Sequence, residues 1–273
     1  MTNNLFVNNE GSIYGMEITD FSMDYFSLKG KNAIVTGGNT GLGQAFSLAL
    51  AKAGANIMFP SIMPDDPEFN KLIEAEGVKA VYMYADITQP GVPKEIATKC
   101  VDVLGSADIL VNCAGICICE DVRDFGREHW DPMIAINLTA AFEMSRECAL
   151  YMIEQRSGKI INICSMFTWL GGQLSPAYAA SKHGIAGLTK AYCDELAQYN
   201  VQVNGIAPGY FKTKVAQSSI DNPERNKWIV DHTPEGRWGD VHDLMGATVF
   251  LASKASQFVN GHILAVDGGF MTR

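Results

Sequence analysis

The sequence has no long apolar run and no excess of basic residues. No uninterrupted apolar stretch reaches the roughly 18 residues that a membrane-spanning helix needs, so we expect no membrane span. No Lys or Arg precedes Lys29 and no apolar block stands near the start, so we expect no secretory signal. The formal net charge is −9, which disfavours partners with phosphate backbones such as nucleic acids.

Cysteines at zinc-site spacing are also missing. The seven cysteines are scattered through apolar segments, which suits buried thiols in a reducing cytoplasm. Cys113, Cys117 and Cys119 form the one cluster, and no fourth ligand stands at the spacing of a zinc site. We therefore expect a cytoplasmic protein without a metal, and a metal at this cluster is the weaker interpretation.

What the chain does have is a regular alternation of strand and helix patterns, with no Pro- or Ser-rich linker between them. It predicts a single doubly wound α/β domain of the Rossmann type over residues 28–273, with a mostly parallel seven-stranded sheet. Residues 1–27 are weakly patterned and are interpreted as an N-terminal extension, either a variable tail or an arm that reaches a partner subunit or the active site. The predicted strands lie in "NAIVTGG", "NIMFPS", "AVYMYAD", "ADILVNCAG", "GKIINICS", "VQVNGIAPG" and "HILAVDGG", with helices at 42–54, 68–77, 93–104, 131–154, 176–198 and 240–252.

A glycine-rich stretch, "TGGNTGLGQ", joins the first predicted strand to the first helix. Gly37, Gly41 and Gly43 allow a tight turn and let a pyrophosphate approach the backbone. The helix then offers free N–H groups and the positive end of its dipole. The strand–loop–helix context favours a nucleotide site over a tight turn without a ligand.

A second motif, "SPAYAASKHG", places Tyr178 and Lys182 one helical turn apart. Ser175 is a candidate helix cap, and Pro176 suits the first turn. A tyrosine phenol has a pKa near 10, and a neighbouring ammonium group would favour its phenolate form. The pair therefore predicts a general acid/base; a surface Tyr and Lys at helical spacing is the alternative.

These motifs together, from about Leu28 onward, resemble the short-chain dehydrogenase/reductase family. The spacing TGxxxGxG, "NCAG" at 112–115, "APG" at 207–209, Asn137, Ser165 and "YAASK" all match that family, with Cys113 replacing its usual second Asn. The resemblance implies that Tyr178 exchanges a proton with the substrate oxygen and that Ser165 hydrogen-bonds the same oxygen. It implies that Lys182 lowers the Tyr178 pKa and holds the nicotinamide ribose, and that Asn137 holds a water. The hydride would add to the B face of the nicotinamide.

The resemblance also implies an NAD(P) cofactor. Ser61 and Thr40 are neutral at the positions that discriminate between NAD and NADP. Asp65, Asp66 and Glu68 follow closely and would oppose a 2′-phosphate, so NAD is favoured over NADP. The implied cofactor-binding residues are Gly37, Asn39, Thr40, Gly41, Leu42, Gly43, Ser61, Asp86, Ile87, Asn112, Ala114, Gly115, Tyr178, Lys182, Pro208, Gly209, Tyr210 and Thr213.

The nearest resemblance within the family is to the 2-dehydro-3-deoxy-D-gluconate 5-dehydrogenase and gluconate 5-dehydrogenase group, through "EGRWGDVHDLMG" and "NGHILAVDGG" among other stretches. It implies a sugar acid or related carbohydrate as substrate. That group carries arginines where this chain has "ICIC", and a carboxylate substrate would want a cation. Lys212, Lys214 and His183 are possible substitutes, and a neutral polyol, a ketose or an apolar alcohol stays open as substrate. The expected substrate-binding residues are Ser165, Phe167, Gln173, Tyr178 and Tyr210, within a wider lining of Met166, Thr168, Trp169, Leu174 and Phe211.

The expected assembly is a homotetramer, by analogy with the family's contacts through the last strand and the helices at 131–154 and 176–198. The alternative is a monomer that buries those faces internally. A catalytically silent nucleotide-binding protein is the rival function. It is disfavoured because Ser165, Tyr178 and Lys182 are all present.

Overall fold

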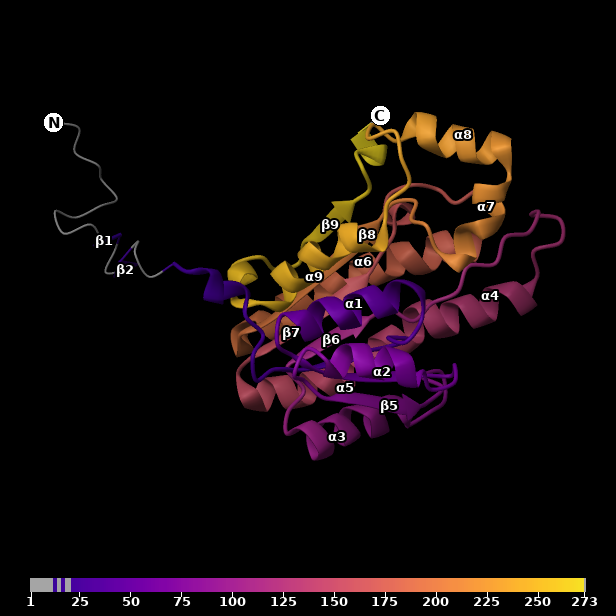
Figure 1. Ribbon diagram of the computed structural model, residues 1–273. Helices are drawn as coiled ribbons and strands as arrows, with labels where there is room; N and C mark the ends of the chain where they lie inside the picture. Colours follow the sequence, from indigo (N-terminus) through magenta and orange to yellow (C-terminus); the bar gives the residue numbers. More distant parts are fainter. Residues whose placement is uncertain (1–11, 14–15, 18–20, 273) are drawn as a thin grey trace, which may run out of the picture.

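The centre of the molecule is a parallel sheet with the strand order β5-β4-β3-β6-β7-β8-β9 (Figure 1). The computed structural model describes residues 12–13, 16–17 and 21–272. A short antiparallel pair, β1 (Ser12–Ile13) and β2 (Met16–Glu17), precedes the sheet. The seven-stranded, doubly wound prediction is confirmed. The strands are β3 (Asn32–Val35), β4 (Asn56–Ser61), β5 (Ala80–Tyr84), β6 (Ile109–Asn112), β7 (Gly158–Ile163), β8 (Val201–Pro208) and β9 (Ile263–Val266).

Helices cover both faces of this sheet (Figure 1). One face carries α1 (Gly41–Lys52), α2 (Pro67–Glu74) and α9 (Met245–Ala252); the other carries α3 (Val92–Leu104), α5 (Ala140–Gln155) and α6 (Pro176–Leu196). Successive side chains of a strand point to opposite faces, so each strand feeds both layers. In β3, Ala33 and Val35 pack with the α1 side, and Ile34 packs with the α3 side.

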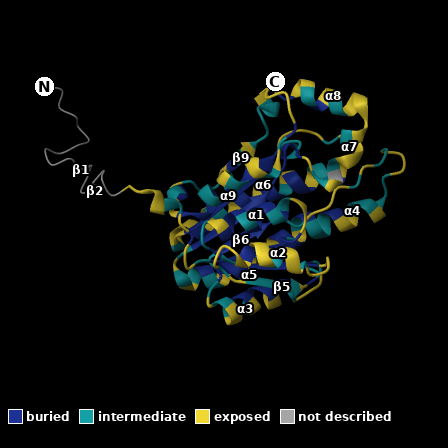
Figure 2. Ribbon diagram, in the orientation of Figure 1, coloured by how far each residue is buried: buried dark blue, intermediate teal, exposed yellow. Residues whose placement is uncertain are grey.

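Burial on both faces explains why the strands read as continuous apolar runs rather than as alternating patterns. The buried residues form a band through the sheet and the inner sides of the helices, while the outer sides of α2 and α3 are largely exposed (Figure 2). Every residue of β3, β6, β7 and β8 is buried. The carboxyl edge of this rigid sheet is the platform for the loops described next.

The helix predicted at 131–154 is longer and is interrupted. It begins as α4 (Arg127–Ile134), passes through a π-helical turn (Ala135–Thr139) and continues as α5. Such turns often mark functional sites because they re-aim side chains, and this one contains Asn137. The helix predicted at 240–252 starts with a 3-10 turn at Val241–Leu244, and its α-helical part begins at Met245.

Two helices were not predicted from the sequence: α7 (Gln217–Asp221) and α8 (Pro223–His232). They lie near the C-terminus of the chain, beyond the end of β8 (Figure 1). Asn222 caps α8 by accepting a hydrogen bond from the backbone N–H of Arg225 at 3.0 Å, and Pro223 occupies the first helical position. This Asn-Pro pair is a recognisable start signal, although the apolar pattern behind it is weak.

Most of the predicted extension, residues 1–27, lies outside the described residues, so the domain boundary at 28 stays a prediction. Within the described chain, no helix combines the length and the hydropathy that crossing a membrane requires.

Candidate active site

The loop between β3 and α1 has the shape of a phosphate cradle. Gly37 and Gly41 have φ values of +65° and +50°, in the left-handed region that glycine adopts without strain. A Cβ on Gly43 would lie 2.2 Å from the carbonyl oxygen of Gly37, so only glycine lets the helix come this close to the loop. No atom lies within 4 Å of the position that a Cβ on Gly41 would occupy, which leaves room for a ligand.

The next part of the cofactor region lies at the end of β4. The Asn39 amide donates to the Pro64 carbonyl at 2.9 Å, and its buried Oδ1 has no hydrogen-bond partner among the described residues. Ser61 is buried and accepts from the backbone N–H of Met63 at 3.1 Å. An unpaired buried acceptor beside an open glycine loop suits a ligand that carries donors, as the hydroxyl and amino groups of NAD(P) do.

The acidic residues after β4 are already engaged within the protein. Asp66 caps α2 through the backbone N–H of Phe69 at 3.1 Å, and Asp65 accepts from the Asn70 amide at 2.9 Å. Their negative charge still lies close to Ser61 in the sequence. Asp86, after β5, accepts from both the backbone and the hydroxyl of Thr88, which lowers the pKa of its carboxyl group.

The "NCAG" turn follows β6. The Thr36 hydroxyl accepts from the backbone N–H groups of Cys113 and Ala114, both at 3.0 Å, so the turn is fixed without the Cys113 side chain. The Asn112 amide instead points into the core and donates to Asn162 Oδ1 at 2.8 Å. The side-chain nitrogen of Asn112 thus serves the core beneath the sheet, while its buried Oδ1 has no hydrogen-bond partner among the described residues.

Tyr178 lies in the first turn of α6, and Ser165 directly follows β7. The Ser165 hydroxyl hydrogen-bonds the Tyr178 phenol and also accepts from the backbone N–H of Phe167 at 3.2 Å. The Thr168 hydroxyl accepts from the Ser165 backbone at 3.3 Å and donates to the Lys182 carbonyl at 3.2 Å. The turn after β7 is thus tied to α6, and this keeps the Ser165 hydroxyl next to the Tyr178 phenol.

Lys182 is buried one helical turn further along α6. Its Nζ donates to the Ile163 carbonyl at 2.6 Å and lies 5.4 Å from the centre of the Tyr178 ring. Burial lowers the pKa of the Lys182 ammonium group and raises the pKa of the Tyr178 phenol above 10. Desolvation is the dominant effect on the Tyr178 pKa and the Ser165 hydrogen bond only partly opposes it, while the effect of Lys182 on the phenol stays a prediction.

Two expected polar residues have partners that sequence reasoning did not foresee. Ser175 sits at the cap position of α6, but its hydroxyl makes no capping bond and donates to the Ile118 carbonyl at 2.7 Å instead. Asn137 accepts from the Ile116 backbone N–H and donates to the Ile116 carbonyl, both at 2.8 Å. Both side chains therefore fix the loop after β6 against the helices of the site.

Tyr210 is the centre of an aromatic group on the substrate side. Its ring meets Trp238 edge-on at 5.8 Å and Phe270 at 5.3 Å. Its hydroxyl accepts from the Arg225 guanidinium at 3.1 Å. Gln173, in contrast, lies exposed in the loop between β7 and α6. Sequence reasoning missed Arg225, because the residue is carried in by the unpredicted helix α8.

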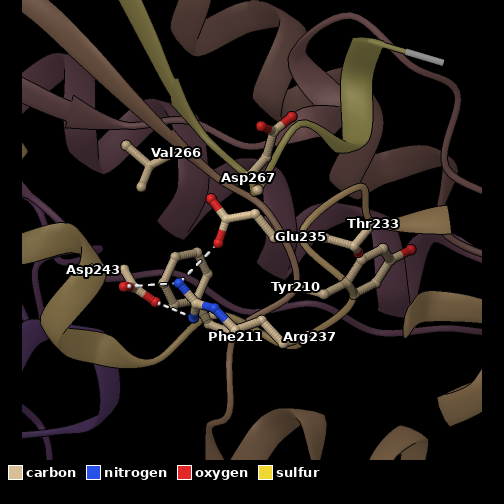
Figure 3. Close-up of a pocket in the computed structure, with 10 residues that line it drawn as sticks. Tyr210, Phe211, Thr233, Glu235, Arg237, Asp243, Val266 and Asp267 are labelled. Carbon is tan, nitrogen blue, oxygen red and sulfur yellow. Dashed lines mark hydrogen bonds and ion pairs between the residues drawn. The ribbon is translucent and has the colours of Figure 1, made fainter. Parts of the chain in front are cut away.

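A cavity of about 210 Å³ lies behind Tyr210, between the end of β8 and the end of β9 (Figure 3). Arg237 dominates its polar wall but is already paired with Asp243 at 2.7 Å and with Glu235 at 2.9 Å. An arginine neutralised by two carboxylates is a poor receptor for a further anion. The cavity contains none of the expected catalytic side chains, so the candidate site is the Ser165–Tyr178–Lys182 group.

Comparison with known proteins agrees with this geometry. The model of the short chain dehydrogenase family matches residues 31–224. An uncharacterized oxidoreductase, YgcW, of Escherichia coli strain K12 is 62% identical over 93% of this chain and 97% of that protein. The 2-dehydro-3-deoxy-D-gluconate 5-dehydrogenase of Bacillus subtilis strain 168 is 45% identical over 92% of this chain and 98% of that protein.

The similarity to known proteins extends to a solved structure. The gluconate 5-dehydrogenase of Burkholderia cenocepacia J2315, in complex with NADP and tartrate, superimposes with a TM-score of 0.86 at 36% sequence identity. The match covers 92% of this chain and 98% of that one.

Proposed function

The chain belongs to the short-chain dehydrogenase family and is an NAD(P)-dependent oxidoreductase, and from that premise we propose that it interconverts a secondary alcohol and a ketone on a sugar acid. The observation that carries the proposal is the convergence of Ser165, Tyr178 and Lys182 at the carboxyl end of β7, beside an open glycine loop. Bound NAD(P) would supply or accept the hydride.

The cofactor would be held by the backbone of the loop at 37–43, by Asn39 and by Lys182. Tyr178 would give its phenolic proton to the substrate oxygen during reduction and take it back during oxidation. The raised pKa of Tyr178 keeps it protonated near neutral pH, the form that ketone reduction requires. Ser165 would hydrogen-bond the same oxygen, because its hydroxyl already contacts the phenol. Asn137 would position the loop at Ile116 that borders the site.

Arg225 supports the sugar-acid substrate. It lies against Tyr210, and its guanidinium stands 4.7 Å from the centre of the Trp228 ring and 5.7 Å from that of Tyr210. No carboxylate is recorded as its partner in the described structure, so its planar fork is available to a substrate carboxylate. The relatives named for gluconate-type acids point the same way.

A neutral polyol, ketose or apolar alcohol is the second candidate. It is favoured by residues 116–119 of the loop after β6, where Ile116 and Ile118 alternate with Cys117 and Cys119; Arg123, further along this loop, is paired with Asp121. A turnover screen by nicotinamide absorbance separates the two. D-Gluconate and D-glucitol form the matched pair, because they differ at carbon 1 only in carboxylate against alcohol. Deoxygluconate derivatives, simple secondary alcohols and hydroxysteroids complete the screen. Turnover confined to neutral alcohols would refute the sugar-acid substrate.

For the cofactor we favour NAD. Asp65 and Asp66 follow Ser61 closely, and their charge would oppose a 2′-phosphate. The NADP bound to the Burkholderia enzyme argues the other way. Parallel assays with NAD and NADP decide between them, and a lower KM for NADP would reject the preference.

For the assembly we propose a cytoplasmic homotetramer. The outer side of α5 exposes Phe142 and Leu150, and the Phe142 ring stacks on Tyr192 of α6 at 6.3 Å. Exposed apolar side chains on these two helices suit a subunit interface. The free cysteines suit a reducing compartment. Light scattering coupled to size-exclusion chromatography tests the tetramer, and a monomeric mass would reject it.

A further inference from the structure

Two thiols lie next to each other in the loop between β6 and α4. The Sγ atoms of Cys117 and Cys119 are 4.0 Å apart, and both residues are exposed. Residues two apart in an extended segment point to the same side, which explains the approach of the two sulfurs. Neither the catalytic scheme nor the cofactor site uses these two side chains.

The loop that carries the thiols is fixed from both sides. The backbone N–H of Glu120 donates to the Leu174 carbonyl at 2.8 Å, and the Ser175 hydroxyl donates to the Ile118 carbonyl at 2.7 Å. On the other side, Ile116 is held by the Asn137 amide. Because the backbone is held before, between and after the two cysteines, the sulfurs are presented as a pair.

Cys117 lies at the start of the helix that carries Tyr178. Its Sγ is 3.7 Å from the hydroxyl of Ser175, the residue three positions before Tyr178. A bulky group bound to the two sulfurs would therefore stand at the N-terminal end of α6, on the approach to Tyr178, and obstruct the substrate.

The spacing of the sulfurs indicates what they can bind. The two thiols are in non-bonded contact at 4.0 Å, and small rotations of their side chains bring both sulfurs within about 2.3 Å of one bridging atom, the length of a typical metal–sulfur bond. No group of three Cys, His, Asp or Glu side chains suited to a metal ion exists in the part of the chain that the structure describes. The pair therefore fits a thiophilic atom that needs only two protein ligands.

We propose that Cys117 and Cys119 form a dithiol site for trivalent organoarsenic compounds and related two-thiol electrophiles, and that occupancy closes the active site. An arsenic atom with one organic substituent has two remaining bonds. In the reaction, the oxygen of the reagent's As=O group takes the two thiol protons and leaves as water. Two As–S bonds replace the As=O double bond. Arsenic and sulfur keep their oxidation states, so no oxidant or reductant takes part.

The environment of Cys117 gives the site its selectivity. Although Cys117 as a whole residue is exposed, its sulfur is partly desolvated, which raises its pKa to about 11, so the thiolate is scarce near neutral pH. Alkylating agents and peroxides react through the thiolate and should act slowly. The arsenical condensation consumes the protonated thiols and releases only water, so the high pKa does not oppose its equilibrium.

The test uses phenylarsine oxide on the full chain. We expect one arsenic per chain by mass spectrometry under native conditions, and loss of turnover on whichever alcohol the screen identifies. Excess 2,3-dimercaptopropanol should restore activity, whereas 2-mercaptoethanol should not. Cys117→Ser and Cys119→Ser should each weaken inhibition by about 100-fold, because the gain from the second, intramolecular bond is lost. Cys193→Ser, which removes a partly exposed thiol elsewhere on α6, should behave as wild type.

Two outcomes would overturn the proposal. One is unchanged arsenic uptake in the Cys117→Ser–Cys119→Ser double variant, and the other is stoichiometric uptake without inhibition. If a variant fails to fold, peptide mapping of the wild type replaces it: bound arsenic must protect Cys117 and Cys119 from alkylation after denaturation. The uptake measurement needs no substrate, so a failure of the sugar-acid proposal does not affect it.

Discussion

The nucleotide half and the substrate half of the active site are built by different means. In the nucleotide half, the backbone of a continuous stretch, residues 36–44, makes the cradle, and glycine is required because a side chain at Gly43 would collide with the loop. The substrate half is built from side chains of four distant segments: Ser165 after β7, Tyr178 in α6, Tyr210 after β8 and Arg225 in α8. A half built from local backbone is readable from sequence, whereas a contact such as that between Tyr210 and Arg225 is decided by the packing of distant segments.

The largest expected effect tests the chemistry of the substrate half. Tyr178→Phe removes the phenolic proton but keeps the ring against Phe167. We expect kcat/KM to fall about 1,000-fold, within the range of general acid–base catalysis. Cofactor affinity, measured by NAD(P)H fluorescence, should change less than about twofold, because the ring and its packing are retained. Activity that survives this change would mean that another group transfers the proton.

The next effect tests the backbone of the nucleotide half. Gly43→Ala places a methyl group 2.2 Å from the Gly37 carbonyl, so the loop must shift. Overpacking of this kind costs about 1–3 kcal/mol, and cofactor Kd should rise by about 10- to 100-fold. Gly187→Ala in α6 is the matched control, because no atom lies within 4 Å of its built Cβ. Equal cofactor affinity in both variants would show that the loop is no cradle.

A smaller effect tests the substrate cation. Arg225→Ala should lower the preference for D-gluconate over D-glucitol by about tenfold, the value of one charge-assisted hydrogen bond of about 1.5 kcal/mol. The preference of Arg225→Lys for D-gluconate should lie between those of the wild type and Arg225→Ala, because lysine keeps the charge but loses the planar fork. Lys227→Ala on the same helix is the control, since Lys227 already pairs with Asp231. If kcat/KM falls equally for both substrates, Arg225 does not recognise the carboxylate.

The smallest effect lies at the opposite edge of the sheet and should leave both halves unchanged. Lys159, at the start of β7, is buried, and burial lowers its pKa from 10.5 to about 8. Between these pH values the unfolded chain binds the proton that the folded chain releases, so stability from this group rises with pH across that interval and is lowest below pH 8.

Lys159→Met should therefore raise the free energy of unfolding by about 1–2 kcal/mol at pH 7. This gain is smaller than the free energy that the full pKa shift represents, because the variant also loses the Lys159 contacts to Ser256 at 3.4 Å and Gln257 at 3.5 Å. Urea titrations at pH 7 and pH 10 measure this, and the gain should shrink at pH 10. A variant that is less stable at pH 7 would show that the two contacts outweigh the desolvation. kcat should not change.

Sequence reasoning predicted the sheet, the glycine loop and the spacing of Tyr178 and Lys182 from residues close together in the chain, and it reached Ser165 through the family resemblance. It misplaced the role of Ser175, whose cap position is local but whose hydroxyl partner, Ile118, is far away in the sequence. It also missed α8 and with it Arg225. The Asn222–Pro223 start signal was present, but a helix of mixed polarity has no apolar pattern to support it.

The sequence by itself determined the family and the doubly wound fold, since apolar runs, glycine positions and motif spacing act over a few residues, and the family resemblance implied Tyr178 as the proton-transfer residue. Only the tertiary structure decided which side chains meet around Tyr178. It brought two thiols to 4.0 Å near Ser175, buried the phenol so that its pKa rises, and laid an arginine of α8 on Tyr210. The physical reason is that burial and contact between distant segments depend on how the layers pack, and no local pattern encodes that packing.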